Sequence, residues 1–311
     1  MNFIQMKEKR IVSFLPSATE LIYELNAANK LFGVTHECDY PKEAVTKPRV
    51  IESVFDPEKM SSKEIDDKIC FLSEKGEDIY KLVQENLIKA KPNLIISQEI
   101  CEVCSAYTDQ VKTAIDILDD KPEIYSMSPH DIQGIIQSVR DISKMIGEIE
   151  NGENLLKLLN SKINNMKEKE FQNKPKVLGI EWIEPFFTAG HWVPDMVETA
   201  GGINMITKSG EHSRKMDIAE IEKANPDVII LMPCGFGVER TVSEYKKVLK
   251  EDSRWNELRA VKKNRVFVVN ANSYFSKPSI RIFTGIEILA KILHPDLFLK
   301  LEVPSNSFLK I

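Results

Sequence analysis

Short apolar runs alternate with stretches of helical periodicity along the whole chain, and this alternation limits the fold more than any other feature. It is typical of α/β proteins in which helices connect parallel strands. In the first half, the predicted strands are Ile11–Leu15, Leu31–Thr35, Leu94–Gln98 and Glu123–Met127, with a short edge piece at Pro48–Val50. In the second half, they are Lys176–Trp182, Val228–Leu231 and Val266–Val269.

One apolar stripe runs from Ser128 to about Lys169 at spacings of three and four residues, as expected for a single long helix. Ser128 is suited to cap this helix and Pro129 fits its first turn. The pair Asn151-Gly152 is the place where we expect a bend. A helix of about 40 residues would be about 60 Å long, which is more than one domain needs. We therefore predict that it connects two lobes.

The chain has 311 residues, too many for one ordinary core. We predict an α/β fold with two Rossmann-like lobes, each built on a central parallel sheet and joined by the long helix. The predicted segments are an N-terminal lobe at 1–127, an interlobe helix at 128–170 and a C-terminal lobe at 171–311. A ligand is expected in the cleft between the lobes.

Two further helical regions are expected in the first half. The sequence Ser17-Ala18-Thr19-Glu20 is a capping box that predicts a helix directly after the first strand. Residues Glu64 to Ala90 carry apolar side chains at helical spacing, and Gly76 is expected to divide them into two helices.

Composition and charge exclude several classes of protein. The net charge of −5 argues against a nucleic-acid binder, which would carry a basic face. No stretch approaches the roughly 18 apolar residues of a membrane span, so the chain is not expected to be membrane-embedded. Charged residues precede the first apolar run, unlike in a secretory signal, and a cytoplasmic location is expected. The five cysteines are an odd number in a large chain, which disfavours a disulfide framework.

Parallel sheets bind ligands beyond the carboxyl ends of their strands. The polar and aromatic residues that follow the predicted strands are therefore candidate ligand-binding residues. They are Ser17, Thr19, His36, Glu37, Tyr40, Glu99, Glu181, Trp182, Phe187, His191, Trp192, Tyr274 and Phe275.

Four of the five cysteines also follow predicted strands. Cys101 and Cys104 have the two-residue gap that lets both sulfurs reach one metal ion. Together with Cys38 and Cys234 they are candidate ligands for zinc or an iron–sulfur cluster. A redox role, or simple packing, remains open for the same residues. Cys70, on the apolar pattern of a predicted helix, is expected in the core.

The aromatic residues among these candidates predict a wall for a large flat ligand. His36 or His191 is a candidate ligand for the metal of such a molecule, for example the cobalt of a corrinoid; the alternative is that each imidazole hydrogen-bonds its own loop. His130, His212 and His294 are assigned no site role. The helix that begins near Ser17 offers N–H groups to an anionic ligand group, or is an ordinary helix start.

Catalytic motifs such as GxGxxG, a Walker loop, HExxH and GxSxG are absent from the sequence. A binding protein is therefore favoured over an enzyme. An enzyme remains open as an alternative if carboxylates such as Glu37, Glu99 and Glu181 act beside a cysteine-bound centre.

Several stretches of the chain resemble one family. They are RIVSFLPSATELIYEL at 10–25, FGVTHECDYP at 32–41, FTAGHWVPDMVETAGGIN at 187–204, DIAEIEKANPDVIIL at 217–231 and ANSYFSKPSIRIFTGIEIL at 271–289. The chain resembles the helical-backbone class of periplasmic-type substrate-binding proteins, which bind cobalamin or ferric siderophores for ABC transporters. The resemblance implies two α/β lobes, one bridging helix and a ligand between the lobes.

Within this class the chain is similar to a subgroup of cobalamin-binding proteins without export signals. The shared phrases are THECDYP at 35–41, Cys101-x-x-Cys104, GHWVP at 190–194 and MPCG at 232–235. The resemblance implies a binder of a corrinoid or another metal complex. The alternatives are a cysteine-ligated metal or iron–sulfur protein that uses the same cleft, and an ordinary solute-binding component of an ABC transporter.

Overall fold

The computed structural model describes residues 8–98 and 106–311, and the chain divides into two compact units. Unit 1 consists of Met1–Asp56, Phe71–Ser128 and Ile136–Leu156, and unit 2 of Pro57–Cys70, Pro129–Ile135 and Lys157–Ile311. Each unit is thus formed by three separate stretches of the chain, with segment 57–70 assigned to unit 2 and segment 136–156 to unit 1. The predicted boundaries after residues 127 and 170 stay a prediction, as does a ligand site between the lobes.

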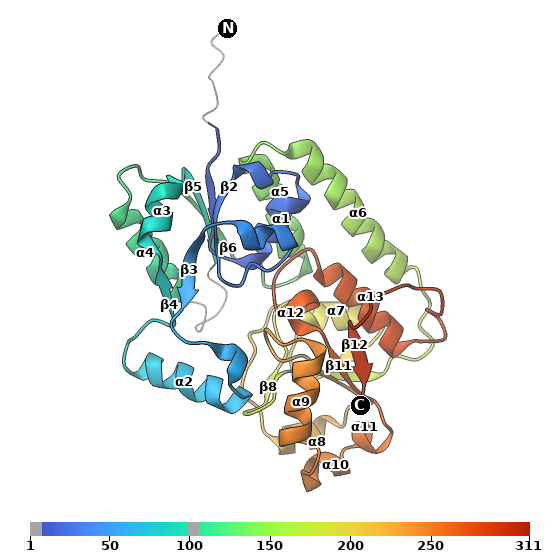
Figure 1. Ribbon diagram of the computed structural model, residues 1–311. Helices are drawn as coiled ribbons and strands as arrows, with labels where there is room; N and C mark the ends of the chain where they lie inside the picture. The colour runs from blue at the N-terminus through green and yellow to red at the C-terminus, as the bar shows by residue number, and fades with distance from the viewer. Residues whose placement is uncertain (1–7, 99–105) are drawn as a thin grey trace. The chain divides into compact units, whose positions relative to one another are not determined.

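Unit 1 is built on a six-stranded sheet with the order β4-β3-β2-β1-β5-β6 (Figure 1). All neighbouring strands are parallel except β3 and β4. The strands are β1 (Ile11–Ser13), β2 (Leu31–Thr35), β3 (Arg49–Ser53), β4 (Tyr80–Leu82), β5 (Leu94–Gln98) and β6 (Glu123–Met127). The connecting helices include α1 (Pro16–Glu24), α3 (Gln84–Ala90) and α4 (Ala106–Ile117). Val12, Phe14 and Ile95 lie in the core that these elements bury.

Unit 2 contains a second sheet with the order β12-β11-β10-β7-β8, and β9 also pairs with β7. β7, β10 and β11 are parallel, whereas β8 and β12 are antiparallel to their neighbours. The strands are β7 (Lys176–Trp182), β8 (Phe187–Thr188), β9 (Ile203–Asn204), β10 (Val228–Leu231), β11 (Val266–Val269) and β12 (Phe308–Lys310). The helices are α7 (Val193–Thr199), α8 (Ile218–Ala224), α9 (Val238–Val248), α10 (Ser253–Glu257), α11 (Arg259–Lys262), α12 (Ala271–Tyr274) and α13 (Ile282–Leu293).

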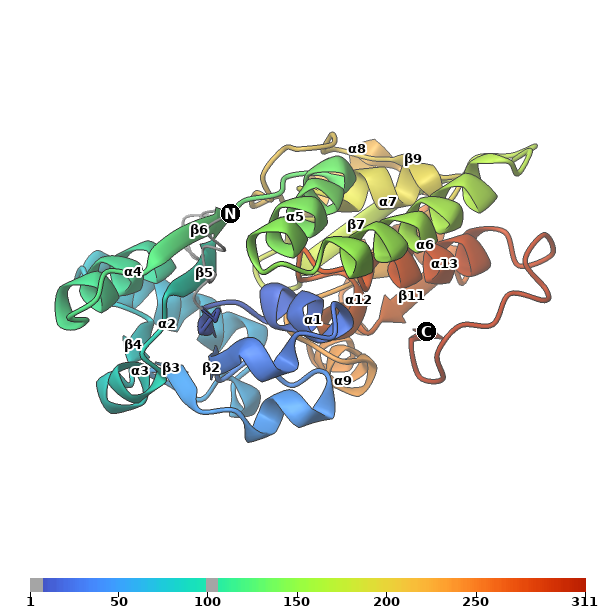
Figure 2. The same cartoon turned by 90° about the horizontal axis from the view of Figure 1, so that it is seen from above.

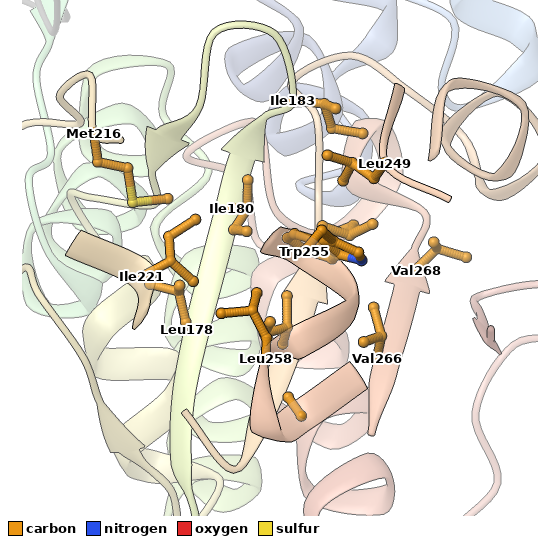
Figure 3. Packing of buried hydrophobic residues seen from close by; sticks show 13 residues of the cluster. Leu178, Ile180, Ile183, Met216, Ile221, Leu249, Trp255, Leu258, Val266 and Val268 are labelled. Carbon is orange, nitrogen blue, oxygen red and sulfur yellow. The ribbon is translucent and has the colours of Figure 1, made fainter. Parts of the chain in front are cut away.

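The core of unit 2 gathers around Trp255, a fully buried side chain that α10 carries onto the sheet (Figure 3). Its ring stacks on Phe186 at 6.0 Å between centroids and meets the edge of Tyr245 at 6.4 Å. Leu178 and Val268 belong to the same cluster and are both fully buried. The strands are apolar at successive positions because helices cover both faces of the sheet.

The predicted single helix over 128–169 is wrong, because the structure has two helices there, α5 (Ile132–Met145) and α6 (Ile149–Lys167). Gly147, at φ +79°, ends α5. Glu148 N donates to Ser143 O and Gly147 N donates to Lys144 O, which are the two hydrogen bonds of a Schellman motif. The break therefore precedes the Asn151-Gly152 pair. Beyond it, α6 runs beside α13, and Lys162 Nζ lies 2.8 Å from Glu287 Oε2 (Figure 2).

The helix starts also differ from the expected caps. Pro16 begins α1, with Leu15 in the cap position and no side-chain cap, so the predicted capping box is wrong. Ser17 falls inside the first turn and is buried. Asp131, rather than Ser128, precedes α5, and its Oδ1 accepts a hydrogen bond from Gly134 N at 2.6 Å.

The two helices predicted over 64–90 are present as α2 (Ser62–Glu74) and α3, and Gly76, at φ +66°, follows the end of α2. Strand β4, which lies between them, was not predicted. The residues of β4 extend the sheet by pairing antiparallel with β3, which a helical reading of the apolar spacing missed. Cys70 is exposed on α2 and is not a core residue.

The predicted α/β class is confirmed, and six predicted strands match the observed bounds (Leu31–Thr35, Leu94–Gln98, Glu123–Met127, Lys176–Trp182, Val228–Leu231 and Val266–Val269). No helix among the described residues has the length and apolarity needed to cross a bilayer.

Candidate functional site

The carboxyl edge of the unit 2 sheet carries several of the predicted ligand-binding residues. Because β7, β10 and β11 run parallel, the loops that follow them emerge at this edge. Cys234 N donates to Glu181 O at 3.0 Å, which joins the loop after β10 to the end of β7. Gly235 N donates to Ser276 Oγ at 3.1 Å, which joins it to the segment after α12.

Two further segments of unit 2, 187–191 and 207–215, are held side by side by backbone hydrogen bonds. Thr188 N donates to Arg214 O, His191 N donates to Glu211 O, and Gly210 N donates to His191 O. His191 has φ +54°, a left-handed conformation that is uncommon for a residue other than glycine. This conformation is retained because both backbone polar groups of His191 have partners on the neighbouring segment.

Gly190 permits the close approach of these segments. A Cβ at position 190 would lie 2.5 Å from Ser213 N and 2.6 Å from Glu211 O, both backbone atoms. We expect Gly190→Ala to destabilise the protein by about 1–3 kcal/mol, the range found for overpacking. Urea denaturation monitored by circular dichroism measures the change. Gly237→Ala is the control, since a Cβ there meets nothing within 4 Å. Equal stability of the two variants would contradict the expectation.

Three histidines of unit 2 lie together at these segments, although the sequence assigned a role only to His191. His191 Nε2 lies 3.2 Å from His212 Nδ1. The ring centroids are 5.1 Å apart for this pair, 5.3 Å for His130 and His212, and 6.0 Å for His130 and His191. His130 precedes α5, so the cluster joins positions 130, 191 and 212, and no local spacing could have revealed it.

The His191 imidazole is uncharged at neutral pH. Burial, together with the neighbouring His212 and His130, lowers the pKa of His191 from 6.5 to about 4. The side chain is only 9% exposed. A neutral imidazole is the form that binds metal ions.

The predicted aromatic wall divides into half-buried and buried rings. Trp182, Phe187 and Tyr274 keep part of their surface open. Trp192 and Phe275 are buried, and Trp192 Nε1 donates to Phe275 O at 2.8 Å. Trp192 and Phe275 therefore hold the start of α7 against the end of α12.

Segment 57–70 of the chain packs on the same edge of unit 2. Ser62 is fully buried, and its N and Oγ donate to Glu244 Oε1 at 2.7 and 2.5 Å. Trp182 Nε1 donates to Ser62 O at 3.1 Å. Arg240 donates to the carbonyl oxygens of Pro57 and Met60. This segment, which the sequence placed in the first lobe, therefore covers part of the Trp182 side chain.

The unit 1 candidates lie at the carboxyl ends of β1 and β2. Cys38 is fully buried, and its Sγ lies 3.1 Å from Thr19 Oγ1. Ser17 Oγ faces Met127 Sδ at 4.0 Å. Near them, the rings of His36 and Tyr80 are 5.6 Å apart.

Glu37 and Tyr40 follow in the same loop, and Tyr40 is 46% exposed. Arg49 donates to Thr35 O and Cys38 O and so fixes this loop against β3.

The predicted cysteine-bound centre is not supported. Cys38 is buried in unit 1, Cys234 is exposed in unit 2, and Glu99, Cys101 and Cys104 lie outside the described residues. Within 8–98 and 106–311, no group of three or more His, Cys, Asp or Glu side chains is arranged, as it stands, to hold a metal ion.

Known proteins resemble this chain over most of its length. An uncharacterized ABC transporter substrate-binding lipoprotein of Bacillus subtilis, YvrC, is 28% identical over 95% of this chain and 83% of its own. The high-affinity heme uptake system protein IsdE of Staphylococcus aureus is 26% identical over 59% of this chain and 61% of its own.

Solved structures share the fold. An ABC transporter substrate-binding protein from Listeria monocytogenes matches 93% of this chain and 100% of its own, with a TM-score of 0.71 and 19% identity. The periplasmic vitamin B12 binding protein BtuF of Vibrio cholerae matches 91% of this chain and 95% of its own, with a TM-score of 0.65 and 19% identity.

These relatives correct the predicted compartment. The cytoplasmic location is wrong, because the related proteins are lipoproteins or periplasmic proteins, which work outside the cytoplasm. The prediction depended on the absence of one recognisable signal, and such an absence is weaker evidence than the location of relatives. A family model described as "Periplasmic binding protein" matches residues 11–272, and the chain belongs to this family.

Proposed function

We propose that this protein is the substrate-binding component of an ABC-type uptake system and that its ligand is a metal complex of a large ring, a heme or a corrinoid. The relatives support the transport role, since YvrC is named as an ABC transporter substrate-binding lipoprotein. IsdE, whose name refers to heme uptake, and BtuF, which is named for vitamin B12, support the ligand class.

The observation that carries the proposal is the set of half-buried rings at the carboxyl edge of the unit 2 sheet. Trp182, Phe187 and Tyr274 come from three different elements, the end of β7, β8 and α12. An aromatic face that is partly open to water gains free energy when a flat apolar ligand covers it. Trp182 and Phe187 are opposite each other on β7 and β8, and neighbouring rings of this kind suit a broad planar ligand better than a small polar one.

His36 is the candidate in unit 1 for a ligand to the metal. Its Nδ1 is buried and has no hydrogen-bond partner among the residues that the structure describes. Buried polar atoms are nearly always paired, so this nitrogen suits a small buried partner such as water, and the metal would be met by the other ring nitrogen, Nε2. An imidazole nitrogen is a good ligand for iron or cobalt.

Titration of the full chain with heme and, separately, with cyanocobalamin tests the proposal through absorption spectra and calorimetry. We expect saturable binding of one of them. Phe187→Ala should weaken it by about tenfold, since an aromatic contact contributes about 0.5–1.5 kcal/mol beyond the area it buries. Phe71→Ala is the matched control, because Phe71 is 47% exposed on α2.

Failure of the wild-type protein to bind either compound would contradict the proposed ligand class. Equal affinity of Phe187→Ala and wild type would contradict the role of the rings. Binding of heme alone or of the corrinoid alone identifies the ring system.

A further inference from the structure

Three imidazoles of unit 2 form a cluster that the proposed binding of a ring complex does not use. His130, His191 and His212 come from the segments before α5, after β8 and before α8. The backbone hydrogen bonds between 187–191 and 207–215 hold two of these segments in fixed register. The backbone therefore holds His191 and His212 close together, and their approach does not depend on side-chain conformation alone.

The spacing of the first two imidazoles is that of two ligands on one metal ion. His191 Nε2 and His212 Nδ1 are 3.2 Å apart. With zinc–nitrogen bonds of about 2.0–2.1 Å, this separation gives an angle at the metal of about 100°, close to tetrahedral. In the absence of metal the same distance suits a hydrogen bond, which a metal ion would replace.

His130 lies close enough to supply a third ligand. Its ring centroid lies 5.3 Å from that of His212 and 6.0 Å from that of His191. Imidazoles around one tetrahedral ion have ring centres about 5 Å apart at these bond lengths. The three donors do not converge as the structure stands. The half-exposed His130 side chain has to turn toward the other two to complete the site.

We propose that His130, His191 and His212 form a binding site for a divalent transition-metal ion of the zinc class. This site goes beyond the proposed function, because the metal of a heme or corrinoid offers one axial position on each face. Two imidazoles at this spacing require two adjacent positions on one ion, which a free ion or an open chelate has. Zinc and nickel suit imidazole donors, whereas magnesium and calcium prefer oxygen.

The test uses the full chain without a polyhistidine tag, stripped with EDTA and titrated with ZnCl2 by calorimetry. We expect one Zn²⁺ per chain. His212→Ala should weaken binding by about a hundredfold or more, since even partners behind a metal ligand contribute about 10–100-fold to affinity. His212 is exposed, so this variant is expected to fold. His130→Ala should weaken binding in the same direction.

His294→Gln is the matched control, because His294 lies in unit 2 but bonds Gly201 O at 3.0 Å instead of joining the cluster. The titration is repeated in a Cys101→Ser, Cys104→Ser background to remove thiolate binding. Absence of Zn²⁺ binding in the wild type would overturn the proposal, as would full affinity in a His130→Ala, His212→Ala double variant. Heme and cyanocobalamin titrations of the same variants report separately on the proposed function and should be unchanged.

Discussion

Replacement of Trp255 with Ala is expected to lower the free energy of unfolding by about 3–5 kcal/mol, the range found when a buried Trp or Phe is truncated to Ala. The side chain is fully buried, and strands β7, β10 and β11 supply much of the apolar surface around it. Removing the indole leaves a cavity that the sheet cannot close, since its strands are held by hydrogen bonds on both sides. Urea denaturation followed by circular dichroism measures the loss without relying on tryptophan fluorescence.

Two variants test the cause of this effect. Trp255→Phe keeps an aromatic ring in the cluster and should cost clearly less than the Ala variant. Leu299→Ala should change stability by no more than about 0.5 kcal/mol, because Leu299 is 75% exposed. A loss below about 1 kcal/mol for Trp255→Ala would mean that the core of unit 2 closes around the cavity or is loosely packed.

Acidification from pH 7 to pH 4 is expected to remove up to about 3 kcal/mol of stability through His191 alone. Burial holds the pKa of His191 at about 4 in the folded protein, against 6.5 when the residue is unfolded. Between these values the unfolded chain binds the proton and the folded chain does not. Stability therefore rises with pH through this window, and the contribution of His191 is fully present above pH 6.5.

His191→Asn is the variant that isolates this effect. Asn does not titrate, and it tolerates the left-handed backbone conformation that position 191 requires. The free energy of unfolding is measured from pH 4 to pH 7 with EDTA present, so that no metal ion contributes. We expect a smaller slope in the variant than in the wild type. Identical slopes would contradict the uncharged state of His191 in the folded protein.

The strands were predictable because their signal is local. Residues such as Val228–Leu231 form a short apolar run between Asp227 and Pro233, and a strand buried on both faces needs that pattern. The break between α5 and α6 also had a local signal in Gly147. The break was missed because the apolar spacing continues on both sides of Gly147. A pattern of apolar spacing cannot show that one residue has a left-handed backbone conformation.

The candidate site was predictable only in part. The rule that ligands bind beyond the carboxyl ends of parallel strands selected His191, Trp182 and Phe187. It did not separate half-buried rings from Trp192 and Phe275, whose burial depends on how the loops pack. It also gave no role to His212, which follows none of the predicted strands, or to His130, which belongs to the predicted start of the helix after Glu123–Met127.

The family, the α/β class and the bounds of six strands could be predicted from the sequence, because each depends on residues that are close in the chain or on motifs read in order. The packing of segment 57–70 on unit 2, the burial of Cys38 beside Thr19 and the meeting of His130 and His212 with His191 could be found only in the folded chain, because these contacts join residues far apart in the sequence. At His191 and His212, backbone hydrogen bonds and the missing Cβ of Gly190 allow the close approach, and neither leaves a pattern in the spacing of side chains.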